Sequence, residues 1–179
     1  MNEVRVIKKR LIYQGKAFSF CSDEIEFNDK VMRKDYVLYP EAVAIVPVIG
    51  QNKFVLVRQF RYPVNDSVLE VPAGKLEPGE SVTDGAIREL EEETGYKPNK
   101  ITKLYEYYPA VGYSSEKIHI VLARDLEKTQ KRLDEDEFTE VEILEHSEIM
   151  DMIRCGVIKD AKTIISFLLI EQFGGVYEI

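Results

Sequence analysis

Residues 74–96 read GKLEPGESVTDGAIRELEEETGY, and this stretch carries the strongest structural and chemical signals in the chain. Residues 81–93 predict a helix. Ser81 is the candidate N-cap, with Asp84 three residues later, where a capping box usually has Glu or Gln. Gly95 supplies the stop, because glycine readily adopts the left-handed conformation that ends many helices. The segment before Ser81 is therefore expected to lead directly into a well-bounded helix.

Three glutamates of this helix, Glu89, Glu92 and Glu93, occupy positions i, i+3 and i+4, which share one helix face. Bare carboxylates there repel one another: at an effective dielectric constant of about 20, a pair ~4 Å apart costs about 4 kcal/mol before screening. A hard divalent cation such as Mg²⁺ removes this cost and also binds substrate phosphates. Glu80, just before the helix, could reach the same end. The alternative is a solvated helix face on which Arg88 and Glu92 form an i,i+4 ion pair.

The complete spacing resembles the Nudix box, Gly-x5-Glu-x7-Arg-Glu-U-x-Glu-Glu-x-Gly-U, in which U is a bulky aliphatic residue. Its fixed positions are matched by Gly74, Glu80, Arg88, Glu89, Leu90, Glu92, Glu93 and Gly95. Tyr96, at the last U position, is the one loose fit. The chain is identified on these residues as a member of the Nudix hydrolases, which implies a Nudix-type α/β/α sandwich and hydrolysis of a diphosphate bond.

The resemblance extends outward from the box over roughly residues 40–170. Four flanking segments look like the ADP-ribose pyrophosphatase branch of the family: QFRY at 59–62, LEVPAG at 69–74, GYSSE at 112–116 and GVIKDAKTI at 156–164. One position departs from that branch, which usually has Pro immediately before the Gly that here is Gly112. Val111 holds that place in this chain.

The resemblance also implies a metal site. Glu89, Glu92 and Glu93 match the carboxylates that bind Mg²⁺, with Mn²⁺ as an alternative ion, and Ala73 matches a position whose backbone carbonyl is a further ligand. Arg88 matches an arginine that orients the catalytic glutamates, so we place it with Glu92 among the catalytic residues. The metal would polarise the diphosphate and help to activate the attacking water.

The general base of this branch comes from a loop after the box, which the acidic segment LDEDEFTEV at 133–141 resembles. By its position before the following strand we select Glu135, with Glu137 second and Glu116 third. The alternative is that the acidic run is only a solvated loop.

Four residues are candidates for substrate binding. Arg61 follows a buried strand and could hold a substrate phosphate or the terminal ribose, and Glu70 lies in the flanking motif 69–74. Arg33, in the N-terminal strands, could reach the site of a partner subunit. Tyr113 could stack on adenine. The plainer alternatives are a surface salt bridge for Arg61 and ordinary packing for Tyr113.

The rest of the chain predicts strands on both sides of the helix and two helices at the end. Residues 42–49 form a near-continuous apolar run, typical of a buried strand, and residues 54–60 predict a second central strand. Further strands are expected at 24–27, 31–38, 68–71, 102–108, 118–123 and 141–144, and helices at 147–155 and 160–173. This order favours an α+β fold or a three-layer sandwich over a regular parallel α/β fold.

Two regions are expected: N-terminal strands over residues 1–40 and a Nudix hydrolase domain over residues 41–179. The N-terminal strands look too small to be stable alone. In the branch that the chain resembles, such strands pair across a two-fold dimer and help to form the site. The resemblance therefore implies a homodimer whose fold carries a small N-terminal β-strand extension.

Composition excludes several classes of protein. The chain has 179 residues, 45% hydrophobic and 31% charged, which is typical of a globular domain. Its 24 Lys and Arg against 32 Asp and Glu give a formal charge of −8, opposite to that of a general nucleic-acid binder.

Cys21 and Cys155 form no CxxC pair, so we expect no structural zinc site, a reducing compartment and burial of both thiols. We see no signal peptide and no membrane-spanning apolar run, and expect a cytoplasmic protein with no membrane partner.

The resemblance to the ADP-ribose pyrophosphatase branch implies Mg²⁺-dependent hydrolysis of ADP-ribose to AMP and ribose 5-phosphate. The rival substrates are other nucleoside diphosphate sugars, such as ADP-glucose or GDP-mannose. A rival from another class is a Nudix-fold module that binds a nucleotide without hydrolysing it. The intact Glu89, Glu92 and Glu93 argue against that rival, since a pure binder could lose them.

Overall fold

The computed structural model describes residues 3–131 and 139–173. The described chain divides into two compact units. One contains residues 3–41 and 107–117, and the other contains residues 42–106, 118–131 and 139–173. None of the described helices has both the length and the apolar character needed to cross a bilayer.

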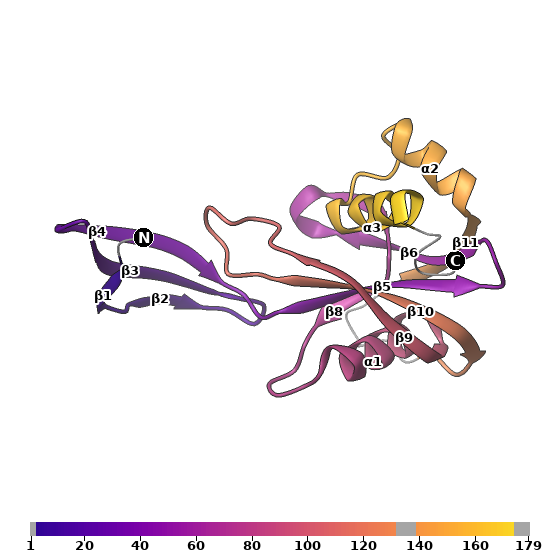
Figure 1. The fold of residues 1–179 in the computed structure, drawn as a ribbon, viewed down its shortest axis with the longest axis horizontal. Coiled ribbons are helices and arrows are strands. Elements are labelled where there is room, and N and C mark those ends of the chain that lie inside the picture. The colour runs from indigo at the N-terminus through magenta and orange to yellow at the C-terminus, as the bar shows by residue number, and fades with distance from the viewer. Residues whose placement is uncertain (1–2, 132–138, 174–179) are drawn as a thin grey trace. The chain divides into compact units, whose positions relative to one another are not determined.

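The first unit contains a four-stranded antiparallel sheet built around β3 (Ser19–Phe27). β4 (Lys30–Leu38) pairs with β3 along its whole length, while β1 (Arg5–Lys8) and β2 (Leu11–Gln14) pair with its two ends (Figure 1). Asn28 and Asp29, both at positive φ (52° and 58°), form the turn between β3 and β4. This is the geometry that hairpin turns of two residues favour, and it explains why Asn and Asp stand there.

Large apolar side chains remain exposed on this small sheet. They are Val4, Val6, Ile7, Leu11, Ile12, Tyr13, Phe18, Phe20, Val31 and Leu38. Cys21 of β3 is buried, as expected. The same expectation is wrong for Cys155, which lies at the C-terminal end of a helix in the second unit and is exposed.

The second unit is built on a mixed sheet with β5 (Ala42–Ile49) at its centre. Its strand order is β11 (Thr139–Glu145), β6 (Lys53–Arg61), β5, β10 (Ile118–Lys128) and β9 (Tyr96–Tyr107). β10 is parallel to β5, whereas β6 runs antiparallel to both β5 and β11. A short 3-10 turn, η1 (Tyr62–Val64), leads from β6 into β7 (Asp66–Glu70), which pairs with β6, and β8 (Ala73–Lys75) pairs with β5.

Helices cover both faces of this sheet, which confirms the predicted α+β fold and the α/β/α sandwich. In Figure 1, α1 (Val82–Thr94) lies on one face, while α2 (His146–Arg154) and α3 (Ala161–Phe173) lie on the other. β5 is apolar along nearly its whole length because both of its faces are covered.

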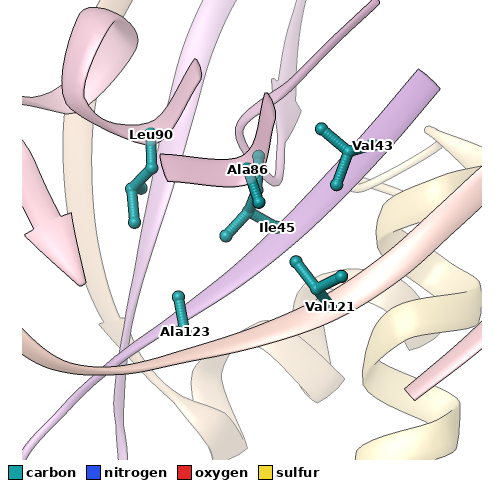
Figure 2. Close-up of a cluster of buried hydrophobic side chains, with 6 residues drawn as sticks. All are labelled: Val43, Ile45, Ala86, Leu90, Val121 and Ala123. Atoms are coloured by element: carbon teal, nitrogen blue, oxygen red, sulfur yellow. The ribbon is translucent and has the colours of Figure 1, made fainter. Parts of the chain in front are cut away.

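Alternate residues of β5 supply the core beneath α1. Val43 and Ile45 pack with Val121 and Ala123 of β10 and with Ala86 and Leu90 of α1, and all six are buried (Figure 2). On the opposite side of the sheet, Phe54 of β6 meets Phe167 of α3 edge to face, with ring centroids 5.1 Å apart. The core contacts therefore fix the rotation of α1 and decide which of its residues remain at the surface.

The ends of α1 are as the sequence predicts. Ser81 is the N-cap, and its hydroxyl accepts a hydrogen bond from the N–H of Asp84 at 3.1 Å. Gly95 ends the helix at φ 70°, and its N–H donates to the carbonyl of Glu91. These two caps hold α1 between β8 and β9, with the glutamates of the quoted stretch on its second half.

Candidate active site

Glu89, Glu92 and Glu93 of α1 differ in exposure because Leu90 and Ala86 face the core. Glu93 is buried, at 4% exposure, and its Oε2 accepts a hydrogen bond from the N–H of Ala73 at 3.2 Å. The side chain of Glu89 is 15% exposed and that of Glu92 is 42% exposed. The predicted carboxylate row therefore runs from the buried Glu93, next to Ala73 of β8, to the exposed Glu92.

Arg88 lies at the centre of this row. Its Nη1 donates to Oε1 of Glu89 at 2.8 Å and to Oε2 of Glu92 at 3.2 Å. Its Nε and Nη2 each donate to one carboxylate oxygen of Glu80 at 2.9 Å, and Nη2 also donates to the carbonyl of Lys75 at 3.0 Å. One guanidinium thus joins the turn before α1, the strand β8 and two of the three glutamates. The i,i+4 pair of Arg88 and Glu92 exists, but as one part of this larger network.

The network has a clear electrostatic effect. Hydrogen bonds from Arg88, together with one from the N–H of Glu77, lower the pKa of Glu80 to about 2. Hydrogen bonds to Glu80, and then to Glu89, raise the pKa of Arg88 above its ordinary value. Glu80 and Arg88 therefore remain charged across the neutral range and hold each other in place.

Gly74 brings the backbone of β8 against the site. A Cβ atom on Gly74 would lie 1.9 Å from the carboxyl carbon of Glu89, so the Glu89 carboxylate, which is hydrogen-bonded to Arg88, would have to move. Gly74 pairs with Val43 of β5, and Ala73 pairs with Ala44, so β8 is held in register by the central strand. The backbone of residues 73–74 therefore reaches the carboxylates only because position 74 has no side chain.

The chemistry of this donor set fits a hard divalent cation. Three carboxylates and a nearby strand backbone offer only oxygen ligands, which Mg²⁺ prefers. Within residues 3–131 and 139–173, no three His, Cys, Asp or Glu side chains are gathered around a single point that could hold an ion. In the described structure, Glu89 and Glu92 are instead hydrogen-bonded to Arg88. The residues that would hold such a cation are Glu89, Glu92 and Glu93.

A second charged cluster surrounds Glu70 at the end of β7. Arg61 binds the buried Glu70 through two hydrogen bonds, Nε to Oε1 at 2.7 Å and Nη2 to Oε2 at 2.8 Å. Lys162 of α3 also donates to Oε2 of Glu70, and at 3.0 Å to Oδ1 of Asp160. Burial alone would raise the pKa of Glu70, but Arg61 and Lys162 outweigh it and hold that pKa below its ordinary value. Glu70 is therefore a buried anion, and the Arg61 side chain remains 43% exposed.

Other predicted site residues lie elsewhere in the chain. Arg33 belongs to β4, and Tyr113 and Glu116 belong to the segment 107–117, so all three are part of the first unit. Tyr113 is exposed. Glu135 and Glu137 lie outside the described residues.

The residues that flank this undescribed segment lie beside the C-terminal half of α1. Lys131 donates through Nζ to the carbonyl of Thr139, and the hydroxyl of Thr139 donates to the carbonyl of Glu93 at 3.2 Å. Burial lowers the pKa of Lys131, while the charges of Glu93 and Glu140 oppose that shift. Both flanking residues thus meet next to the most buried glutamate of the predicted metal site.

Sequence reasoning gives no role to Lys162, Asp160 or Thr163, which complete the cluster around Glu70. The available signal is the segment 156–164, which resembles one branch of the family without indicating what its residues do. Their contacts could not be predicted from spacing, because Lys162 and Glu70 are 92 residues apart.

Several known proteins are similar to this chain over most of its length. The Nudix domain family matches residues 38–167. An ADP-ribose pyrophosphatase of Bacillus subtilis (strain 168) is 38% identical over 164 residues, which cover 90% of this chain and 89% of that protein. A methanol dehydrogenase activator of Bacillus methanolicus is 37% identical over 167 residues, with 92% and 90% covered. A crystal structure of an ADP compounds hydrolase superimposes with a TM-score of 0.84 at 27% identity, over 100% of this chain and 98% of that one.

Proposed function

This chain belongs to the Nudix family, and on that premise we propose that it is an enzyme that hydrolyses the pyrophosphate bond of ADP-ribose, with water, to AMP and ribose 5-phosphate. The observation that carries the proposal is the network in which Arg88 holds Glu80, Glu89 and Glu92 beside the backbone of β8. A site that only bound nucleotides would not need this density of carboxylates, since like charges repel the phosphates of a nucleotide.

The proposed metal ligands are the carboxylates of Glu89, Glu92 and Glu93 and the carbonyl of Ala73. We propose Mg²⁺ as the ion, with Mn²⁺ as the alternative, because all four ligands are oxygens. Such a cation, when bound, offsets the charge of the diphosphate and activates water for attack. The N–H of Ala73 already bonds to Glu93, which supports placing the carbonyl of that residue in the ligand set.

Arg88 has the proposed task of holding the catalytic glutamates. Its Nη1 bonds to both Glu89 and Glu92, so it keeps their side chains on the same side of α1. Its bonds to Glu80 and to the carbonyl of Lys75 restrict its own movement. A lysine would provide charge at this place but not the fixed planar arrangement of donors.

Arg61 and Glu70 are proposed to hold the substrate. Glu70 fixes the Arg61 guanidinium through two bonds, which leaves a pre-oriented cation with an exposed side chain. Such a group suits a substrate phosphate or the hydroxyls of the terminal ribose. Arg33 and Tyr113 stay proposals from the resemblance, the first as a contribution to a partner's site and the second as an adenine contact.

Glu135 stays our proposal for the general base. It is four residues from Lys131 and four from Thr139, the two residues that meet beside Glu93. A base must come within hydrogen-bond reach of the attacking water, and the glutamates of α1 are assigned to the metal. Glu137 and Glu116 are the alternatives.

We also propose a homodimer in the cytoplasm, in which residues 1–40 are the dimerising region and residues 41–179 the hydrolase domain. The apolar side chains exposed on β1, β2 and β4 support this assembly, because such surfaces are typical of contact with another chain. The proposal includes no nucleic-acid or membrane partner.

A substrate panel tests the function. ADP-ribose, ADP-glucose and GDP-mannose would be supplied at equal concentration with and without Mg²⁺, and the products separated by chromatography. We expect AMP and ribose 5-phosphate from ADP-ribose, at a higher kcat/KM than for the other two and only with the metal. A preference for another sugar would change the substrate. Tight binding of ADP-ribose without turnover under any metal would support the non-catalytic binding module.

A further inference from the structure

The first turn of α3 is hydrogen-bonded to the segment between β7 and β8, which carries Glu70 and contacts Glu93 through Ala73. Asp160 precedes α3 and acts as its N-cap: its Oδ2 accepts hydrogen bonds from the N–H of Thr163 at 3.0 Å and from its hydroxyl at 2.6 Å. An ordinary N-cap needs only the first of these bonds. The second fixes the direction of the Thr163 hydroxyl, whose proton points toward Asp160.

Because the Thr163 hydroxyl donates its proton to Asp160, its oxygen can act only as an acceptor toward other groups. It accepts a hydrogen bond at 2.9 Å from the N–H of Val71, 92 residues earlier in the chain. Thr163 and Val71 are both 0% exposed, so water cannot replace either partner. A buried N–H that loses its acceptor is costly, and the backbone around Val71 would shift to find another.

Every residue from Glu70 to Ala73 has a hydrogen bond to a residue outside this segment. Glu70 is bound by Arg61 and Lys162, Val71 by Thr163, the carbonyl of Pro72 by the N–H of Ile45 at 2.8 Å, and the N–H of Ala73 by Glu93. This four-residue segment joins β7 to β8. The proposed substrate pair is at its first residue and the proposed metal ligand is at its last.

We propose that Thr163 and Asp160 are positioning residues for the hydrolysis, acting through the backbone of the segment Glu70–Ala73. The hydrogen bond to Thr163 fixes the distance between the Val71 backbone and α3. It thereby positions Glu70 and Arg61 before Val71 in the segment and the Ala73 carbonyl after it. The role rests on the proposed function, because it assigns these two residues to the assembly of that site. Neither residue touches the substrate or the metal.

Ser166, one turn later on α3, offers a matched comparison. It is also 0% exposed, but its hydroxyl donates one hydrogen bond, at 2.7 Å to the carbonyl of Lys162, whereas the Thr163 hydroxyl makes two. That bond remains within the helix and does not reach the segment Glu70–Ala73. Thr163→Val and Ser166→Ala each remove a buried hydroxyl, but Thr163 loses two hydrogen bonds and Ser166 loses one, so Thr163→Val should destabilise the fold more. Only the loss of Thr163 Oγ1 should disturb the site.

The experiment compares three variants of the full chain: Thr163→Val, which keeps the side-chain shape and removes the acceptor, Thr163→Ser, which restores it, and Ser166→Ala. Amide hydrogen exchange would be followed at Val71 and Ala73, and the binding of Mn²⁺ alone would be measured by calorimetry. In Thr163→Val we expect these amides to exchange at least ~10-fold faster and Mn²⁺ to bind about 10-fold more weakly. In Thr163→Ser and Ser166→Ala both quantities should stay within about threefold of wild type.

Steady-state kinetics with ADP-ribose complete the test. We expect kcat/KM to fall about 10-fold or more in Thr163→Val, with KM raised and kcat lowered, and recovery in Thr163→Ser.

Equal losses in Thr163→Val and Ser166→Ala, or unchanged exchange at Val71, would overturn the positioning role. If Thr163→Val does not fold, the wild-type protein still decides: a Val71 amide that exchanges as fast as an exposed one would exclude the bond. If no substrate of the panel is hydrolysed by the wild type, the proposed function fails, while exchange and Mn²⁺ binding still test the positioning.

Discussion

Arg88 binds both carboxylate oxygens of Glu80, with Nε 2.9 Å from Oε1 and Nη2 2.9 Å from Oε2. The side chains of both residues are largely removed from solvent, at 26% and 13% exposure. The pair therefore differs from ordinary surface ion pairs, which contribute little to stability. It ties the turn before α1 to the middle of the helix and fixes the guanidinium that bonds to Glu89 and Glu92.

The first prediction follows from the pKa of Glu80. That pKa is about 2 in the folded chain against 4.5 for a free side chain, so the stabilisation is fully present above about pH 4.5 and is lost as the pH falls toward 2. Glu80→Gln removes it at every pH. We expect the variant to unfold at lower urea concentration than wild type at pH 7, and the difference to shrink between pH 4.5 and 2. A difference that is independent of pH would show that the charge of Glu80 is not what matters.

The second prediction concerns the metal. Glu92→Gln keeps the shape of the most exposed carboxylate in the row but removes a ligand charge. We expect activity to fall at least ~100-fold while the fold is retained, because stabilisation of transition-state charge contributes several kcal/mol. The control is Glu77→Gln, which alters an exposed side chain outside the fixed positions of the box and should change activity little. Comparable losses in the two variants would mean that the helix face is not the metal site.

A third prediction uses the close approach at Gly74. In Gly74→Ala the new Cβ would overlap the carboxylate of Glu89, so Glu89 must leave its place or β8 must separate from α1. We expect at least a ~100-fold loss of activity and weaker Mn²⁺ binding. The comparison variant is Gly85→Ala on α1, whose Cβ would meet Cδ2 of Leu76 at 2.4 Å and Oε2 of Glu80 at 3.1 Å, with Glu89 not among its three nearest contacts. Kinetics and thermal unfolding of both variants would check this, and a harmless Gly74→Ala would remove the requirement for glycine.

The fourth prediction concerns the general base. Glu135→Gln should lower kcat by roughly 10²–10⁴-fold, with little change in KM or in Mg²⁺ affinity, because that is the usual contribution of general-base catalysis. Glu137→Gln and Glu116→Gln should each cost less. The measurement is kcat for the three variants at saturating substrate and metal. A large loss in one of the other two would move the base to that residue, and losses below about threefold in all three would place it among the glutamates of α1.

The fifth prediction concerns assembly. Sedimentation equilibrium at micromolar concentration should give the mass of a dimer, because β2 exposes Leu11, Ile12 and Tyr13 in succession. Ile12→Glu adds a charge to that surface and should weaken the dimer. The control is Tyr105→Glu, at an exposed aromatic residue on β9 of the other unit. A wild-type monomer with full activity would contradict the assembly.

Local signals are enough to predict α1 and the central strands. The N-cap at Ser81, the stop at Gly95 and the apolar run of β5 each depend on a few adjacent residues, and the structure places these elements within one residue of the prediction. β8 is not predicted, since Ala73–Lys75 is short and is defined by its pairing with β5. β9 begins at Tyr96 instead of residue 102, because Pro98 is tolerated on a strand at the edge of the sheet.

In the candidate site too, some features follow from local spacing, whereas others depend on contacts between distant parts of the chain. The carboxylate row follows from helical spacing, so the sequence alone is enough to predict it. For Glu80 and Arg88 the sequence predicts only a common location, because side-chain bonding depends on the path of the turn. The contact of Thr163 with Val71 joins distant parts of the chain, and no periodicity indicates it.

The proposed metal chemistry and the proposed substrate recognition are carried by separate elements, the first by α1 and the start of β8 and the second by the ends of β6 and β7. A duplicated gene could therefore acquire a new nucleotide sugar through changes around Arg61 while its hydrolytic helix stayed intact. Such a change would be constrained at Glu70–Ala73, where every residue has a hydrogen-bond partner. A substitution in this segment would also alter its contacts with the first turn of α3, so compensating changes would be needed in two distant parts of the chain.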